Sequence, residues 1–186
     1  IAVSGGVDSI CLFDIFLNLK DDLDLQIAVV HFNHKLRKDD SDRDQKFVEK
    51  ICRKNKIKLF KSFADVRQFS KDKSLSLEEA ARIKRYEFFE NICNKYKYDY
   101  LATAHTKNDL AETFLLNLFR GSGLHGLTSI PIRRKIAKNS FVIRPLIHFT
   151  KKELINYAEL RSLKWVEDKT NEDIIFTRNK IRNILI

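Results

Sequence analysis

Short apolar runs alternate with segments of helical periodicity along most of the chain, and this alternation restricts its fold more than any other feature. The apolar, β-branched runs are residues 1–3, 25–30, 57–60 and 98–103. The helical patterns lie at about 9–20, 42–55, 76–97 and 108–119. Strands that alternate with helices form βαβ units, in which helices cover both faces of a parallel sheet. We therefore predict an α/β fold with an open, mainly parallel sheet.

The last part of the chain, residues 131–186, differs from the rest in pattern and in charge. It contains one strand-like stretch, Phe141–Ile143, and helical patterns near 150–160 and 174–184. Its 13 basic and 6 acidic side chains leave an excess of seven, most of the net charge of +10. About 50 residues bury little surface alone. We predict a sheet domain over 1–130, with a soft boundary around 130–148, and a basic helical extension over 131–186, packed on the same domain and facing an anionic partner.

The cysteines and the hydropathy indicate the compartment. Cys11, Cys52 and Cys93 are too far apart for a CxxC pair, and each has apolar neighbours. We predict buried free thiols in a reducing, cytoplasmic environment. No uncharged apolar run approaches the roughly 20 residues of a membrane-spanning helix. We therefore expect no membrane partner.

Glycine is confined to two loops, and the first is Ser4-Gly5-Gly6-Val7-Asp8-Ser9, between a predicted strand and helix. Glycines there expose backbone N–H groups at the mouth of the helix, where the helix dipole adds positive potential and favours phosphate. A carboxylate beside phosphate requires a cation between them, and Mg²⁺ accompanies nucleotide phosphates. The loop Ser4–Ser9 therefore predicts a site for a Mg–nucleotide; the alternative is a purely structural turn.

The second glycine loop, Gly121 to Gly126, matches the pattern GxGxxG. A dinucleotide-binding loop must follow a strand, whereas residues 110–119 are predicted to be helical. The first loop is not a Walker loop either, because its Gly-Lys-Ser/Thr ending is absent. We expect the second loop to face the substrate or to be mobile.

Polar side chains also follow two other predicted strands. His31 and Asn33 come after the second strand, and His105, Asp109 and Glu112 come after the fourth. The carboxyl ends of parallel strands share one crevice, where open α/β sheets bind ligands. His105 could contact phosphate or transfer a proton there. Asp109 and Glu112 would either bind a cation or only complement the helix dipole.

Two groups of arginines share helical faces. Arg82 and Arg85, next to Tyr86, lie on or near one face, and Arg178 and Arg182 are spaced i,i+4 in the basic tail. Guanidinium pairs suit phosphate or RNA contacts. The alternatives are a surface ion-pair face for the first group and a structural tether for the second.

In this order, the motifs resemble the tRNA(Ile)-lysidine synthetase family of the N-type ATP pyrophosphatase superfamily. The matching segments are SGGVDS, HFNHKLR, EEAARIKRY, ATAHTKNDLAET, RGSGLHGL, RPL and, near the end, DKTN and RNKIR. They span nearly the whole chain. The first motif marks only the superfamily, whereas the ordered set is specific. The resemblance implies an adenine nucleotide alpha hydrolase-like fold, with ATP and Mg²⁺ as cofactors.

The resemblance also implies a reaction. ATP would adenylate the C2 oxygen of the wobble cytidine in the tRNA(Ile) anticodon, and the amine of free L-lysine would displace AMP to give lysidine. The loop Ser4–Ser9 would hold pyrophosphate, and Asp8 with Glu112 or Asp109 would hold Mg²⁺. Arg82 or Arg85, with His105, would stabilise the α-phosphate. A homodimer is one possible assembly.

The chain departs from the family at two points. Thr106 stands where a second histidine is expected, and the further C-terminal domains that grip the tRNA body lie outside these 186 residues. Two alternatives stay open. A tRNA thiolation enzyme of the same superfamily would want a reactive cysteine pair, which the three cysteines do not provide. A non-catalytic nucleotide- or RNA-binding module would not need carboxylates near phosphate.

Overall fold

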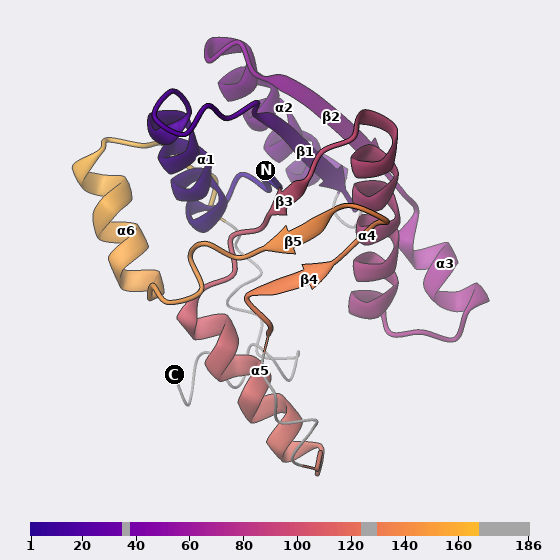
Figure 1. The fold of residues 1–186 in the computed structure, drawn as a ribbon. Coiled ribbons are helices and arrows are strands. Elements are labelled where there is room, and N and C mark those ends of the chain that lie inside the picture. The colour runs from indigo at the N-terminus through magenta and orange to yellow at the C-terminus, as the bar shows by residue number, and fades with distance from the viewer. Residues whose placement is uncertain (35–37, 124–129, 168–186) are drawn as a thin grey trace.

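The computed structural model describes residues 1–34, 38–123 and 130–167 (Figure 1). The helices are α1 (Val7–Leu19), α2 (Lys38–Lys54), α3 (Val66–Asp72), α4 (Leu77–Tyr96), α5 (Lys107–Phe119) and α6 (Lys151–Leu160). The strands are β1 (Ala28–Asn33), β2 (Lys58–Phe63), β3 (Tyr100–Ala102), β4 (Arg133–Lys135) and β5 (Phe141–Ile143). The order of strands and helices confirms the predicted α/β class.

The N-terminal segment, residues 1–3, connects two groups of strands. β1 pairs in parallel with β2, β3 pairs in parallel with β5, and β4 lies antiparallel on the edge of β5. Val3 N–H donates to the carbonyl of Val30 at 3.0 Å, and Ala2 N–H donates to that of Ala102 at 2.9 Å. The spatial order is therefore β2, β1, residues 1–3, β3, β5 and β4, and the sheet is mainly parallel as predicted.

Helices cover both faces of this arrangement, again as predicted (Figure 1). On one face, Val29 of β1 packs with residues of α1 and α2, among them Phe13 and Val48. On the other face, Val30 packs with Phe89 of α4. Successive strand residues thus supply different layers, because side chains alternate across a sheet.

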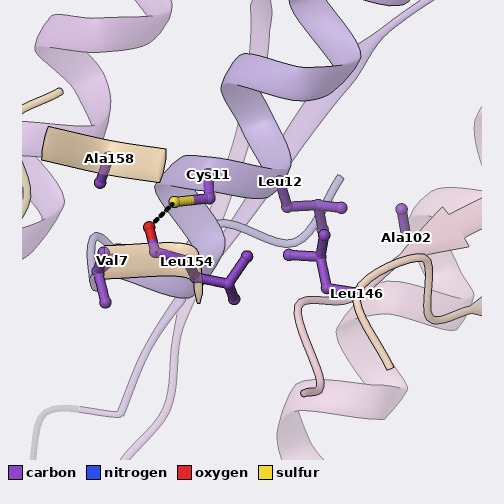
Figure 2. Close-up of a cluster of buried hydrophobic side chains, with 7 residues drawn as sticks. All are labelled: Val7, Cys11, Leu12, Ala102, Leu146, Leu154 and Ala158. Atoms are coloured by element: carbon purple, nitrogen blue, oxygen red, sulfur yellow. Dashed lines mark hydrogen bonds between the residues drawn. The ribbon is translucent and has the colours of Figure 1, made fainter. Parts of the chain in front are cut away.

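Helix α6 packs against α1 through an apolar cluster, which Figure 2 shows. The cluster contains Val7, Cys11, Leu12, Ala102, Leu146, Leu154 and Ala158. The Cys11 thiol donates to the carbonyl of Leu154 at 3.2 Å. The cluster buries the side of α1 that faces α6. It thereby holds in place the start of α1 and the loop Ser4–Ser9 that leads into it. The division of the chain near residue 130 stays a prediction, although β5 and α6 are continuous with the sheet and its helical layer.

Two elements were not predicted, and each has a physical explanation. β4 consists of three exposed basic residues, Arg133 to Lys135, so it lacks the apolar alternation by which strands are recognised. α3 has only seven residues, too few for a clear helical period, and follows the N-cap Asp65, whose carboxylate accepts the N–H groups of Arg67 and Gln68. The predicted helix 174–184, with Arg178 and Arg182, lies outside the described residues.

The thiols agree with the prediction. Cys11, Cys52 and Cys93 are free and buried, each in a different apolar cluster. Burial raises the pKa of Cys11 and of Cys52 to about 11. Residues 124–126 of the second glycine loop lie outside the described residues. Where the chain is described, none of its helices is long and apolar enough to cross a membrane.

Candidate active site

A cavity of about 300 Å³ opens at the carboxyl-terminal edge of the central strands. Its walls come from the loop after residues 1–3, the end of β1, the middle of α4 and the segment after β3. This volume is at the small end of the roughly 300–1,000 Å³ typical of ligand sites. Of the predicted site residues, the cavity brings together Ser4, Gly6, Asp8, Ser9, Arg85, His105 and Asp109.

The loop Ser4–Ser9 is held in shape by one hydroxyl group. Ser9 Oγ accepts the N–H groups of Ser4 and Gly5, each at 3.2 Å, and donates to the carbonyl of Gly6 at 2.8 Å. Gly5 has φ +108°, a conformation that other residues rarely adopt. Val7, by contrast, is buried in the α1–α6 cluster and belongs to the core. The loop is therefore rigid before any ligand arrives.

The loop leads into a helix terminus without a side-chain cap. Gly6 is the N-cap of α1 and makes no side-chain capping hydrogen bond. Four other helices are capped by the side chains of Asp65, Ser76, Thr106 and Thr150. The N–H groups of the first turn and the helix dipole together favour an anion at this position.

Asp8, in the first turn of α1, forms an ion pair that the sequence did not indicate. Lys151 Nζ lies 2.7 Å from Asp8 Oδ2. Lys151 is the first residue of α6, and its N–H donates to Asn108 Oδ1 of α5 at 2.9 Å. The N-termini of α1, α5 and α6 are thus linked beside the cavity.

His105 lies in the cavity wall with its ring partly buried. Its Nδ1 lies 2.9 Å from the hydroxyl of Thr103. Burial lowers the pKa of His105 to about 4, and the positive charges of Arg144, Arg85 and Arg82 also lower it, against the opposing effect of Asp109. The imidazole is therefore neutral at pH 7, so it acts there as a hydrogen-bonding group rather than as a cation.

The two carboxylates of α5 occupy different environments. Asp109 lines the cavity, and its Oδ2 accepts the N–H of Thr106 at 2.8 Å and the Thr106 hydroxyl at 3.0 Å, in a capping box. Glu112 is fully buried and is not part of the cavity wall. The structure therefore places only Asp109 in the crevice, although the spacing puts both on one side of the helix.

His31 and Asn33 do not line the cavity, since they point to the α2 side of β1. His31 Nδ1 donates to the carbonyl of Val3 at 2.8 Å, and Asn33 Nδ2 donates to the carbonyl of Ser41 at 3.3 Å. The alternate residues of the same segment, Phe32 and His34, line the cavity instead. Strand alternation was the signal that could have identified them. Burial, followed by the charge of Arg85, lowers the pKa of His34 to about 4.

Arginines gather around Tyr86 at the α4 side of the cavity. We call Arg82, Arg85, Tyr86, Arg134 and Arg144 the Tyr86 cluster. Arg85 and Tyr86 line the cavity, and Arg82 is exposed outside it. Arg144 is only 2% exposed, and its Nη1 donates to the carbonyl of Pro131. The sequence did not indicate Arg134 and Arg144 as members of the cluster, because Arg134 lies in β4 and Arg144 directly after β5, both far from α4 along the chain.

The sequence profile of the PP-loop domain matches residues 1–186, the entire chain. The chain belongs to the PP-loop family. From here on we call the loop Ser4–Ser9, at the mouth of α1, the PP-loop. Of the predicted phosphate contacts, Ser4, Gly6, Asp8 and Ser9 are the ones this PP-loop presents to the cavity.

Two curated relatives of this PP-loop domain carry the same name. The tRNA(Ile)-lysidine synthase of Clostridium tetani is 40% identical over 186 residues, which is all of this chain and 39% of the relative. That of Chlorobaculum tepidum is also 40% identical over 186 residues, which is 55% of the relative. The chain thus spans between about two fifths and a little over half of the length of these two relatives.

Solved structures show the same fold at low identity. U34-tRNA thiolase NcsA from Methanococcus maripaludis superposes with a TM-score of 0.72 at 16% identity, covering 97% of this chain and 68% of the thiolase. Phosphoadenylyl-sulfate reductase from Candida auris superposes with a TM-score of 0.55 at 10% identity, covering 88% and 72%. Identities this low establish the architecture alone.

Proposed function

We propose that this chain is the catalytic PP-loop domain of a tRNA(Ile)-lysidine synthase. One observation supports the proposal most strongly. A single cavity contains the PP-loop, His105, Asp109 and Arg85, and the chain around it aligns from end to end with proteins of that name. The activity is the ATP-dependent joining of L-lysine to C2 of the wobble cytidine, with release of pyrophosphate and AMP.

The PP-loop would hold the β- and γ-phosphates of ATP. Ser9 already fixes the loop, so no loop ordering opposes ligand binding. The uncapped first turn of α1 offers N–H donors to the departing pyrophosphate. Arg85, in the opposite wall, would contact the α-phosphate, and neutral His105 would donate a hydrogen bond there.

Asp8 and Asp109 fit a magnesium ion, because both are carboxylates in the cavity wall. Within the described residues, no group of three or more His, Cys, Asp or Glu side chains could hold a metal by itself. This suits Mg²⁺, which takes one or two protein carboxylates and completes its shell with water and phosphate oxygens. When bound, it would neutralise charge on the leaving pyrophosphate. The position of Asp109 favours it over buried Glu112 as the second ligand.

The nucleophiles belong to the substrates. The cytidine C2 oxygen attacks the α-phosphate, and the lysine amine then attacks C2 and displaces AMP. The chain's task is to hold an unstacked anticodon base at the cavity, as single-stranded RNA allows. A thiolation enzyme would require reactive cysteines, but the three cysteines lie in separate apolar clusters and none of them lines the cavity. The homodimer and the cytoplasmic location stay predictions.

The experiment measures pyrophosphate release with ATP and Mg²⁺, with and without tRNA(Ile), together with incorporation of labelled lysine or labelled sulfur into the RNA. We expect release that depends on tRNA(Ile), and incorporation of lysine. Sulfur incorporation would overturn the proposal in favour of thiolation. Binding of ATP and RNA without pyrophosphate release would indicate a non-catalytic module.

A further inference from the structure

Three guanidinium groups lie around the ring of one tyrosine. The guanidinium carbons of Arg134, Arg82 and Arg85 are 4.8, 5.2 and 5.8 Å from the centroid of the Tyr86 ring. Cations favour the face of an aromatic ring, but the ring carries no net charge and cannot neutralise them. Neither Arg82 nor Arg134 forms an ion pair with a carboxylate among the described residues. The cluster therefore holds a surplus of positive charge.

This surplus acts on neighbouring groups. After burial, the charges of Arg134 and Arg82 lower the pKa of Arg144, although Tyr86 opposes them. After burial, and against the effect of Asp109, the charges of Arg144, Arg85 and Arg82 also lower the pKa of His105. Like charges held this close destabilise the fold unless an anion joins them. The cluster has the electrostatics of an anion-binding surface.

The position of the cluster indicates the size of the anion. Arg85 and Tyr86 line the cavity, whereas Arg82 and Arg134 are exposed and lie outside its wall. A nucleotide held by the PP-loop would fill most of a cavity of about 300 Å³ and could reach Arg85. A ligand that also reaches Arg82 and Arg134 must extend onto the surface. A polyanion fits this condition.

We propose that Arg82 and Arg134 bind the phosphates of a single-stranded RNA segment as it enters the cavity. Guanidinium groups next to an aromatic ring suit such a segment, because they bind phosphate and stack on unstacked bases. The identity of the RNA as the tRNA(Ile) anticodon loop rests on the proposed function. The assignment of the surface rests on the charge and position of the cluster.

The fold supplies a matched control in Arg133, the neighbour of Arg134 on edge strand β4. Both residues are exposed, and both lie over aromatic rings: the Arg133 guanidinium carbon is 3.7 Å from the centroid of Phe141. Side chains alternate along a strand, so Arg133 lies on the opposite face of the sheet from Arg134. The two residues have the same side chain, lie on the same strand and are both exposed. They differ in that only Arg134 belongs to the Tyr86 cluster.

The experiment compares Arg134→Gln and Arg82→Gln with Arg133→Gln. Binding of a labelled RNA hairpin that carries the tRNA(Ile) anticodon loop is measured by fluorescence anisotropy over a range of salt concentrations. We expect Arg134→Gln and Arg82→Gln each to weaken binding about tenfold and to reduce the salt slope by about 0.7, as for one lost single-strand phosphate contact. Arg133→Gln should bind like the wild type. ATP affinity without RNA should be unchanged in Arg134→Gln.

Two results would overturn the assignment of Arg82 and Arg134 as an RNA-binding surface. One is equal RNA affinity of Arg134→Gln and Arg133→Gln, and the other is a parallel loss of ATP affinity in Arg134→Gln, which would make the cluster part of the nucleotide site. Wild-type pyrophosphate release is measured separately. If RNA binding depends on Arg134 but the wild type releases no pyrophosphate, the RNA-binding surface is supported and the proposed function is overturned. If the wild type releases pyrophosphate but RNA binding does not depend on Arg134, the proposed function is supported and the RNA-binding surface is overturned.

Discussion

The two sides of the cavity handle charge differently. On the PP-loop side, Asp8 is paired with Lys151 at 2.7 Å, and behind it the α1–α6 contact is apolar. On the α4 side, the guanidiniums of Arg82 and Arg134 surround an aromatic ring with no described carboxylate as ion-pair partner. One carboxylate of the PP-loop side is thus paired within the fold, whereas Arg82 and Arg134 of the Tyr86 side have no described carboxylate as partner. We infer that the first positions ATP and the second receives RNA.

Two aspartates of helix α1, Asp8 and Asp14, can be compared in the same way. Asp8 is ion-paired with Lys151, the first residue of α6, and Asp14 with Arg161, the C-cap of α6. Asp14 also accepts the hydroxyl of Tyr157 at 2.7 Å, and burial, followed by Asp14, raises the pKa of Tyr157 to about 12. Asp8 lines the cavity and Asp14 does not. The same type of contact thus serves the site at one end of the helix and the scaffold at the other.

The largest expected effect comes from Asp8→Asn. It should reduce ATP- and Mg²⁺-dependent pyrophosphate release about 100-fold or more, because it removes a negative charge at the reacting phosphates. The melting temperature should change little. The control is Asp14→Asn, which should lower the melting temperature and leave turnover nearly intact. Equal turnover in the two variants would remove Asp8 from the site.

Acidification should reveal the burial of the His105 ring, which is the largest cause of its lowered pKa. The folded protein keeps His105 neutral down to about pH 4, whereas the unfolded chain binds a proton below about pH 6.5. The unfolded state therefore gains protons first as the pH falls. The stability held by neutral His105 is complete above pH 6.5 and is lost as the pH falls toward 4, by about 2 kcal/mol between pH 7 and pH 5.

Urea denaturation at both pH values tests this expectation. His105→Asn should lose about 2 kcal/mol less between pH 7 and pH 5 than the wild type. His148→Asn, which changes an exposed histidine, should behave like the wild type. An identical pH dependence of the wild type and His105→Asn would mean that burial does not lower the pKa of His105 as described.

Alanine substitutions of the two adjacent glycines of the PP-loop distinguish an effect on folding stability from an effect on ligand binding. Gly5→Ala should lower the free energy of unfolding by about 1–2 kcal/mol, because φ +108° strains any side chain. Gly6→Ala should leave stability unchanged, since its Cβ would meet only Ser4 Oγ, at 3.7 Å. Gly6 lines the cavity, so its alanine variant should weaken ATP binding. A stable Gly6→Ala protein with normal ATP affinity would show that phosphates do not approach this backbone.

The smallest effect should come from Lys151→Met. The Lys151 side chain is 43% exposed, so its ion pair with Asp8 is screened by water. We expect the free energy of unfolding to fall by less than about 1 kcal/mol. Lys152→Met, which changes an exposed neighbour, is the control and should cost less still. A loss of several kcal/mol would mean that the PP-loop side is held together by this charge pair rather than by the apolar cluster.

Local patterns in the sequence determined the architecture and the main motif. Alternating strands and helices predicted the parallel sheet with helices on both faces, and the sheet edge brought the PP-loop, His105 and Asp109 to one cavity. The cap at Thr106 was also readable, since capping depends on residues three positions apart. Periodicity and caps arise from interactions within a few residues, so a short window of sequence contains them. The shared crevice follows from the general rule that the carboxyl ends of parallel strands meet at one edge of a sheet.

Only the tertiary structure decided which side chains face the ligand. It turned His31 and Asn33 toward α2, brought Lys151 to Asp8 across 143 residues, and assembled the Tyr86 cluster from α4, β4 and the end of β5. It also buried Glu112 completely while leaving Asp109 in the cavity. Such arrangements depend on strand register and on how helices pack on the sheet. Both are set by contacts between distant segments, which no local pattern records.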